Sequence, residues 1–495
     1  MSTSIPTRSI VQTLAIGLLA FGLLGCQEWT ASRLTKVPTS ALWVGQGGVL
    51  EASDLTRLQE AGVDEIFFYL GKFDPDADGG PLVIEGLRDV PGGIPLTMAI
   101  SGQWSESLEA AEELAEQTAE AAKQLRFDVG DSGALPVGLH FDFTDVSSFE
   151  SLTKFLEVLR KKFERDLFLS FSVQREWLSD PGLADAVGRV DFIVPFLYGQ
   201  RIREAEDPQA WDFVELERNI QKLEDLDSPY MIGIVTLGTA THLDARGSVK
   251  ARMTPISLQE ILWNRDLSLR PGFSLEGSNR RVYSVEAEKP TTVNKWELEV
   301  GDVVRVVRAA TTDLEGLDRI LETLEMPNHL GQLYYRLPRD EERLSLSLDN
   351  LLDVFDDTPA EPDLLFDASL QRRTGRGWLM RFSITNRNDE ITELSLVDSN
   401  YLQARCLNCV FGKADPGDFY RYDLYKTNSS GELERTFRRS DLIRFHVPIL
   451  EGEQNVTSGD VETHLRGEPR VEIEGRFLLP DGRYLEIPPT LWPSP

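Results

Sequence analysis

Residues 136–145 read Pro-Val-Gly-Leu-His-Phe-Asp-Phe-Thr-Asp, and a helix-like segment, 147–163, follows directly. Strand followed by helix is the βα unit of a parallel sheet. Alternate side chains fall on opposite faces of the predicted strand, with Leu139, Phe141 and Phe143 on one face and His140, Asp142 and Thr144 on the other. Both faces of such a strand are normally apolar, so the polar face requires a solvated cavity.

The same alternation of strand and helix recurs along the first two thirds of the chain. A glycine-free and proline-free segment, 105–125, is its clearest helix. More than six such units favour a closed (β/α)8 TIM-type barrel, whose mouth at the carboxyl ends of the strands supplies the required cavity. The predicted strands are 40–45, 65–70, 95–100, 136–145, 167–173, 190–198, 230–237 and 330–337.

Two stretches depart from this rhythm. Polar residues and short strand-like runs near 238–305 indicate an insertion after the seventh strand or a degenerate last unit. Beyond the linker Pro359-Ala360-Glu361-Pro362, only short alternating runs separated by turn residues remain. We therefore expect a barrel over 40–357 and an all-β sandwich domain over 363–495.

The amino terminus resembles a bacterial lipoprotein signal. Arg8 precedes the apolar run 10–24, which ends in Leu23-Leu24-Gly25-Cys26. The resemblance implies that residues 1–26 comprise a signal peptide and a lipidated Cys26. The protein would then be extracytoplasmic and anchored to a bacterial membrane through lipid. Gln27 after the cysteine, where an aspartate is absent, favours the outer membrane, which borders the periplasm. The alternative is an ordinary anchor helix with an incidental cysteine.

Composition excludes several classes of partner. The chain has a formal net charge of −30, whereas nucleic acid requires a basic surface, so we expect no nucleic-acid partner. Besides Cys26, only Cys406 and Cys409 are present, which is half of a zinc site at most. We expect a local disulfide or two unpaired thiols there, no metal and no cofactor.

Three motifs in the barrel region resemble the chitinase-like glycoside hydrolases, and more closely a group of bacterial secreted proteins with glycosidase-type barrels. Ser101-Gly102-Gln103-Trp104 is similar to the S-x-G-G stretch after the family's third strand. Residues 138–144 resemble its D-G-x-D-x-D-x-E signature, and Phe196-Leu197-Tyr198 resembles its M-x-Y element. The resemblance implies a glycan ligand and gives Tyr198 a role in holding a substrate acetamido group.

The signature is incomplete. Val137 and His140 replace its first two aspartates, Asp142 keeps the third, and Thr144 replaces the catalytic glutamate. A threonine hydroxyl cannot protonate a glycosidic oxygen near neutral pH. Asp142 is therefore the candidate catalytic carboxylate, with Asp145 or Glu176 as a displaced acid. The alternative for Asp142 is a satisfied polar residue, and for Glu176 a surface ion-pair partner.

Aromatic residues near the strand ends are candidates for stacking on a sugar ring, since a pyranose has an apolar face. The predicted substrate contacts are His140, Tyr198, Trp104, Trp177 and Tyr335. Each of these residues would otherwise be a core residue, and His140 a satisfied buried histidine. Two functions stay open: a glycan-binding or degenerate hydrolase barrel, which we favour, and an active glycoside hydrolase that uses Asp142 with a displaced general acid.

Overall fold

The structure is a computed structural model. It describes residues 40–87, 90–163, 167–197, 213–253, 256, 258–262, 264, 266–274, 281–309, 311–339, 342, 344–355, 361–373, 377–388, 391–392, 400–464, 468–479 and 483–493. The lipobox-like segment and Tyr198 lie outside these residues. No helix within the described part of the chain is long and apolar enough to cross a membrane.

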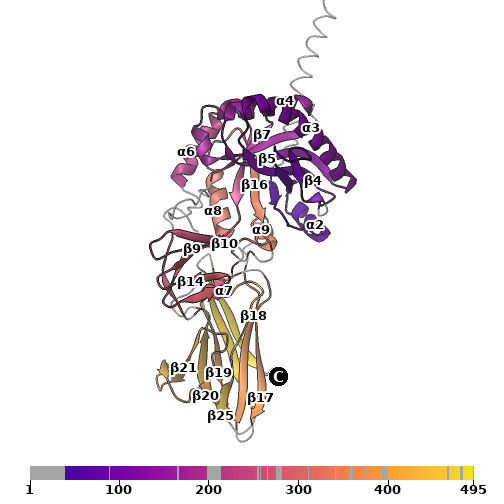
Figure 1. The fold of residues 1–495 in the computed structure, drawn as a ribbon. Coiled ribbons are helices and arrows are strands. Elements are labelled where there is room, and N and C mark those ends of the chain that lie inside the picture. Colours follow the sequence, from indigo (N-terminus) through magenta and orange to yellow (C-terminus); the bar gives the residue numbers. More distant parts are fainter. Residues whose placement is uncertain are drawn as a thin grey trace, which may run out of the picture.

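Eight parallel strands among the described residues form a closed barrel (Figure 1). Their order is β1-β16-β8-β7-β6-β5-β4-β2, and β1 pairs with both β16 and β2, which closes the sheet. The predicted (β/α)8 barrel is thereby confirmed. Its strands are β1 (Ser40–Val44), β2 (Glu65–Phe73), β4 (Pro95–Trp104), β5 (Leu135–Val146), β6 (Phe168–Gln174), β7 (Phe192–Phe196), β8 (Tyr230–Val235) and β16 (His329–Leu337).

Helices surround the barrel, and capping side chains mark where the two longest begin. Ser107 accepts a hydrogen bond from the Ala110 amide at the start of α3, and Ser148 accepts one from the Ser151 amide at the start of α4. A short strand, β3 (Leu82–Ile84), pairs antiparallel with β2. The helices are α2 (Ala52–Glu60), α3 (Leu108–Asp131), α4 (Phe149–Lys162), α5 (Leu183–Val187), α6 (Phe213–Glu224), α8 (Thr311–Leu321) and α9 (Leu348–Phe355), with a 3-10 turn at Arg175–Ser179.

The chain between barrel strands β8 and β16 forms an inserted antiparallel sheet with its own apolar core. The sheet order is β10-β9-β15-β12-β11, and a separate hairpin joins β13 to β14. The elements of this insertion are β9 (Thr239–Leu243), β10 (Val249–Met253), α7 (Leu258–Leu262), β11 (Leu267–Ser274), β12 (Arg281–Ala287), β13 (Thr291–Val293), β14 (Trp296–Leu298) and β15 (Val303–Val307).

The carboxyl-terminal part consists of two antiparallel sheets that share one apolar core. One sheet has the order β17-β18-β25-β20, with β24 also paired to β18, and the other β22-β21-β23-β19-β26-β27. Their strands are β17 (Leu364–Arg373), β18 (Gly377–Asn386), β19 (Tyr401–Cys406), β20 (Val410–Ala414), β21 (Arg421–Thr427), β22 (Leu433–Thr436), β23 (Leu442–His446), β24 (Asn455–Thr457), β25 (Val461–His464), β26 (Val471–Leu478) and β27 (Tyr484–Trp492).

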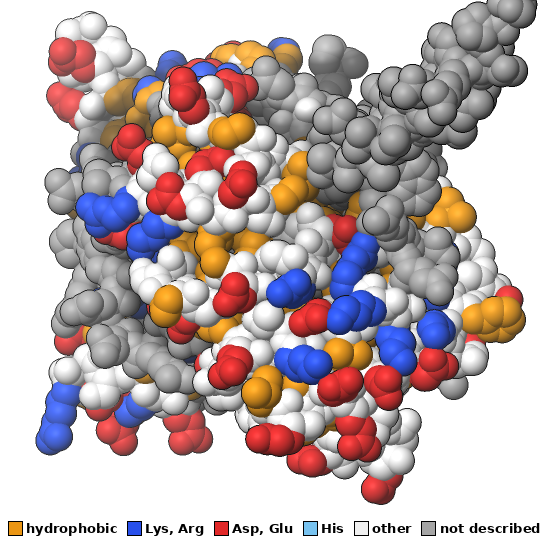
Figure 2. All heavy atoms as spheres, turned by 90° about the horizontal axis from the view of Figure 1, so that it is seen from above, with side chains coloured by type: hydrophobic (Ala, Val, Ile, Leu, Met, Phe, Trp, Pro, Cys, Tyr) orange, Lys and Arg blue, Asp and Glu red, His pale blue; other side chains and the backbone are white. Residues whose placement is uncertain are grey.

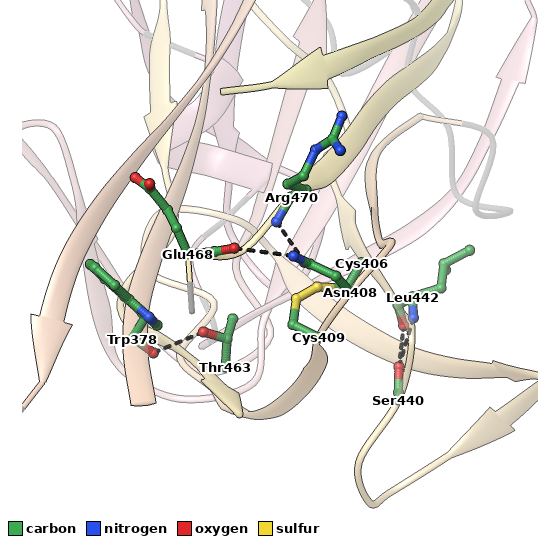
Figure 3. Close-up of a disulfide and its surroundings, with 9 residues drawn as sticks. All are labelled: Trp378, Cys406, Asn408, Cys409, Ser440, Leu442, Thr463, Glu468 and Arg470. Carbon is green, nitrogen blue, oxygen red and sulfur yellow. Dashed lines mark hydrogen bonds between the residues drawn. A yellow bond between two sulfur atoms is a disulfide. The ribbon is translucent and has the colours of Figure 1, made fainter. Parts of the chain in front are cut away.

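A disulfide joins Cys406 to Cys409 in this sandwich (Figure 3). Between them, the side chain of Asn408 donates to the carbonyl of Glu468 at 3.1 Å and accepts from the Arg470 amide at 2.8 Å. The disulfide therefore fixes the turn between the end of β19 and the start of β20. Of the two states left open for these cysteines, the structure has the paired one.

The insertion lies between the barrel and the sandwich, so the sandwich is at the far end of the molecule from the barrel (Figure 1). Ile449 of the sandwich belongs to the apolar core of the insertion. The Leu258 amide also donates to Oε1 of Glu451 at 2.6 Å. Apolar packing and a buried hydrogen bond thus join these two parts.

Candidate functional site

Strand β5 presents its two faces to different surroundings. Phe141 and Phe143 lie on the outer face, where the ring of Phe141 packs against Phe155 of α4 with centroids 5.6 Å apart. His140 and Asp142 lie on the inner face and are both buried. Thr144, two residues further along this face, is exposed at the rim. The inner face thus changes from buried to exposed in the direction of the barrel mouth.

His140 is held inside the barrel by neutral hydroxyls and aromatic rings. Its Nδ1 lies 2.8 Å from Oγ of Ser170, and its Nε2 lies 2.9 Å from Oγ of Ser172. The rings of Trp43 and Phe67 pack edge-on against it, with centroids 5.4 and 5.3 Å away. Burial lowers the pKa of His140 to about 3, so the imidazole is neutral. His140 is not exposed to solvent, and it lies beneath the layer of side chains that includes Asp142.

Asp142 forms the next inner layer and is 9% exposed. Burial raises the pKa of its carboxyl group, while a hydrogen bond with Ser172 acts in the opposite direction. Ser172 therefore bridges His140 and Asp142. Among the residues that the structure describes, no second carboxylate contributes to this raised pKa.

Tyr335 of β16 reaches the same layer from across the barrel. Its ring contacts Trp43 and Phe196, with centroids 5.2 and 5.1 Å away, and it is half-buried. Burial raises the pKa of its hydroxyl group, and the nearby Asp142 raises it further. Gly233 of β8 makes room for this packing, since a Cβ there would lie 2.3 Å from the Phe196 ring. The structure thus brings together three of the predicted site residues, His140, Asp142 and Tyr335.

Thr144, which replaces the family's catalytic glutamate, and the two candidate general acids, Asp145 and Glu176, are all exposed. The Thr144 hydroxyl donates to the Gly102 carbonyl at 3.2 Å, so it interacts with the wall formed by β4. Asp145 is exposed and accepts a hydrogen bond from the Val146 amide at 3.1 Å. Glu176 is exposed on the 3-10 turn after β6. None of these residues provides Asp142 with a buried acidic partner.

The two tryptophans predicted to contact substrate lie in the apolar layer between strands and helices. Trp104 is 1% exposed, packs against Phe155 with ring centroids 4.6 Å apart, and donates from Nε1 to Oγ of Ser151 at 2.8 Å. Trp177 is buried against Phe149, with ring centroids 5.7 Å apart. Neither ring has a face available to a sugar, because both are covered by the helices.

Sequence reasoning missed a polar network on the β2 side of the mouth. The Tyr69 hydroxyl donates to Oε2 of Glu85 at 2.9 Å, and Nζ of Lys72 lies 2.9 Å from Oε1 of the same residue. Lys72 and Tyr69 lower the pKa of Glu85, so this carboxylate is ionised near neutral pH. Tyr69 also hydrogen-bonds Ser101, whose register partner on β5 is Asp142. Glu85 follows a short strand in a loop-rich stretch, so no local pattern identifies it.

The site offers groups that can form hydrogen bonds to a ligand. Within the described residues, no group of three or more His, Cys, Asp or Glu side chains could hold a metal ion. A buried carboxyl group, a half-buried phenol and an ionised carboxylate near the mouth can donate to and accept from the hydroxyl groups of a ligand. Figure 2 shows acidic and basic side chains interspersed over the coloured part of the face seen from above.

No family model matches the sequence, and no curated protein matches it either. Among solved structures, the chain is similar to the chitinase from Chromobacterium violaceum ATCC 12472, with a TM-score of 0.45 and 13% identity over 65% of this chain and 98% of that one. It is also similar to the spore cortex-lytic enzyme SleL of Bacillus cereus, with a TM-score of 0.44 and 12% identity over 65% of this chain and 74% of that one. For the chitinase-like agglutinin of Robinia pseudoacacia the TM-score is 0.42 and the identity 11%, over 64% of this chain and 98% of that one. The structural neighbours are chitinase-like (β/α)8 barrels, and the likeness is one of fold alone.

Proposed function

We propose that this protein is an extracytoplasmic lipoprotein whose barrel binds a glycan without hydrolysing it. The proposal has two parts that can be tested separately: the ligand of the barrel mouth and the lipid anchor at Cys26.

The observation that carries the first part is the residue at the end of the inner face of β5. A glycosidase needs one carboxyl group to protonate the leaving oxygen and a second group to stabilise or attack the sugar. Here Thr144 occupies the rim and its hydroxyl interacts with the Gly102 carbonyl, while among the described residues no other carboxylate contributes to the raised pKa of Asp142 below it. Removal of a general acid typically costs a factor of about 10² to 10⁴ in rate. We therefore expect glycosidase turnover to be very slow.

Binding does not need that acid. The carboxyl group of Asp142 and the half-buried phenol of Tyr335 lie in one layer, and the Tyr69 to Glu85 network adds groups near the mouth. Sugar hydroxyl groups can exchange hydrogen bonds to water for hydrogen bonds to such groups, and the ring face can pack on an aromatic side chain.

The test is a panel of glycans, including amino-sugar polymers and cell-wall fragments, measured for both binding and turnover. We expect binding without turnover, and we expect Asp142→Asn and Tyr335→Phe to weaken it about tenfold each, because the first replaces an oxygen of the buried carboxyl group by an amide nitrogen and the second removes a hydroxyl group. Glu120→Gln, on the exposed face of α3, is the matched carboxylate control and should bind like the wild type.

Turnover that is lost in Asp142→Asn, Asp145→Asn or Glu176→Gln would overturn this part and establish a hydrolase. Equal binding of all variants would place the ligand elsewhere.

The second part concerns the membrane. The apolar run 10–24 ends in Leu23-Leu24-Gly25-Cys26, the pattern that supports lipidation of the cysteine. We expect the wild type to incorporate labelled fatty acid and to fractionate with the outer membrane. Cys26→Ser should abolish the label and release or mislocalise the protein, since the lipid is its only proposed anchor. Membrane retention of Cys26→Ser together with an unlabelled wild type would contradict the anchor.

A further inference from the structure

A pocket of about 700 Å³ lies on the sandwich between the edge strand β20 and strand β21. Backbone hydrogen bonds between Phe411 and Ser440, at 2.7 and 3.1 Å, hold the loop after β22 against β20. The disulfide Cys406–Cys409 comes directly before β20 and fixes the start of that strand (Figure 3). The pocket thus has a braced wall although it opens to solvent.

The charged side chains that line this pocket are all basic. Its lining includes Lys413 of β20, Lys426 of β21, and Arg438 and Arg439 of the loop, with His464 beside them. No Asp or Glu belongs to the lining as far as the structure describes it. We refer to the pocket lined by these residues as the basic pocket.

Within the described residues the four cations are also unusual in forming no salt bridge, although Glu434 of β22 lies directly opposite Lys426 of β21. The chain has 81 acidic and 51 basic residues, so a carboxylate beside any given Lys or Arg is the expected arrangement. Arg435 and Arg421 have this arrangement, since both pair with Asp423, which lies on the face of β21 opposite to that of Tyr422 and Lys426. Across the described residues, by contrast, Lys413, Lys426, Arg438 and Arg439 form no salt bridge. Gathering unpaired like charges costs free energy, which an anionic ligand would offset.

Aromatic side chains accompany the cations. Phe437, in the same loop, is 89% exposed, and Tyr422 of β21 lines the pocket beside it. An exposed phenylalanine contributes nothing to the core, whereas a flat apolar ring beside cations suits a ligand that is both anionic and partly apolar.

We propose that the basic pocket binds an acidic polysaccharide. The carboxylate or sulfate groups of the sugars would pair with Lys413, Lys426, Arg438 and Arg439, and a ring face would pack on Phe437. A pocket of this volume admits a short segment of such a chain. The net charge of −30 opposes the approach of any extended polyanion, so the site suits a short acidic segment of the polysaccharide held in the concave pocket rather than a long stretch lying across the surface.

The site belongs to the sandwich and does not depend on the proposed function of the barrel. The test measures binding of three hexasaccharides to the full-length protein: galacturonic acid, a sulfated glucan and a neutral glucan. We expect binding of one or both acidic probes, weakening as salt is added, and no binding of the neutral one. The two acidic probes distinguish carboxylate from sulfate.

Variants separate the basic pocket from general charge. We expect the pair Lys413→Gln and Lys426→Gln, both exposed residues, to weaken acidic-glycan binding at least tenfold. The matched pair Lys123→Gln and Lys161→Gln changes the net charge equally on barrel helices and should have no effect. Asp142→Asn should also leave this binding unchanged, so failure here is distinguishable from failure of the barrel proposal.

Several results would overturn the proposal. These are equal binding by the Lys413/Lys426 pair variant and the wild type, equal loss in the Lys123/Lys161 pair variant, and absence of binding to both acidic hexasaccharides. Tighter binding of anionic phospholipid vesicles or of an oligonucleotide of equal charge would assign the pocket to a different class of partner.

Discussion

The mouth of the barrel and the basic pocket of the sandwich are built in opposite ways. In the barrel, aromatic rings are buried, the histidine is neutral and the carboxyl group of Asp142 has a raised pKa, so packing sets the chemistry. In the basic pocket, cations and a phenylalanine are exposed on an edge strand and a loop. A buried polar group is constrained by stability as well as by function, whereas an exposed one is constrained only weakly by stability. Substitutions should therefore affect folding in the first region and only binding in the second.

The largest effect is expected at Trp104. We predict that Trp104→Ala lowers the free energy of unfolding of the barrel by about 3 to 5 kcal/mol, because it removes a buried ring that contacts Phe155 and leaves a cavity. Urea unfolding followed by circular dichroism measures the change, and Trp104→Phe, which keeps a ring, should cost less. A change in the free energy of unfolding below about 1 kcal/mol, accompanied by loss of glycan binding, would show that Trp104 contacts the glycan.

The next effect is a pH dependence that originates at the opposite end of the barrel strands from the mouth. Glu65, at the start of β2, is buried and hydrogen-bonded to Thr97, and burial raises its pKa from 4.5 to about 7. A carboxyl group with a raised pKa stabilises the fold fully below pH 4.5 and loses that contribution as the pH rises through 7. At 1.36 kcal/mol per pKa unit, the loss amounts to about 3 kcal/mol.

We therefore predict that the wild type loses stability relative to Glu65→Gln between pH 4.5 and 8. The measurement is urea unfolding of both proteins across this range. His140, whose pKa is lowered to about 3, acts in the opposite sense and destabilises the fold as the pH falls below 6.5. It is present in both proteins, so the difference isolates Glu65. Parallel pH profiles would contradict the assignment.

The sequence predicted the barrel and the alternation along β5, because period-two patterning is a local property. The same alternation of faces along β4 also indicates where Trp104 lies, although the motif resemblance pointed to the mouth. Trp104 shares its parity with Leu96, Met98 and Ile100, which are buried, whereas Ser101 has the opposite parity and hydrogen-bonds Tyr69. Parity therefore indicated the outer layer for Trp104.

Other features depend on contacts between distant segments, which no local pattern reveals. Glu85 becomes part of the mouth only because Tyr69 and Lys72 bind it. The basic pocket combines residues from β20, β21, β22, β25 and the loop after β22, which lie between positions 412 and 464 of the chain. Neither Lys413 nor Arg439 is distinctive in the sequence. The candidate site was thus predictable where it lies on one strand, and not where strands and loops converge.

A smaller effect is expected from the disulfide. We predict that Cys406→Ala with Cys409→Ala lowers the stability of the sandwich by about 2 kcal/mol or less, because only two residues separate the cysteines and little chain entropy is removed. Binding of the acidic hexasaccharides should weaken as well, since β20 carries Lys413 directly after the bridge. Thermal unfolding and the binding assay measure the two effects. Unchanged binding would show that the pairing of β20 with β25 and the Phe411 to Ser440 hydrogen bonds hold the wall formed by β20 without the disulfide.

The smallest effect on stability is expected at Phe437, and it is the counterpart of Trp104. Phe437 is 89% exposed, so Phe437→Ala removes almost no buried surface and should change the free energy of unfolding by less than about 0.5 kcal/mol. If the ring packs on a sugar, the same substitution should weaken binding of the acidic hexasaccharide about threefold to tenfold, the range expected for one aromatic contact. Binding of inorganic sulfate, which has no ring face, should not change. Loss of stability without loss of binding would make Phe437 a structural residue, and equal weakening for hexasaccharide and sulfate would make its contribution electrostatic, through Arg435, which lies 5.9 Å from the centre of its ring. Only weakening confined to the hexasaccharide supports a sugar-stacking role.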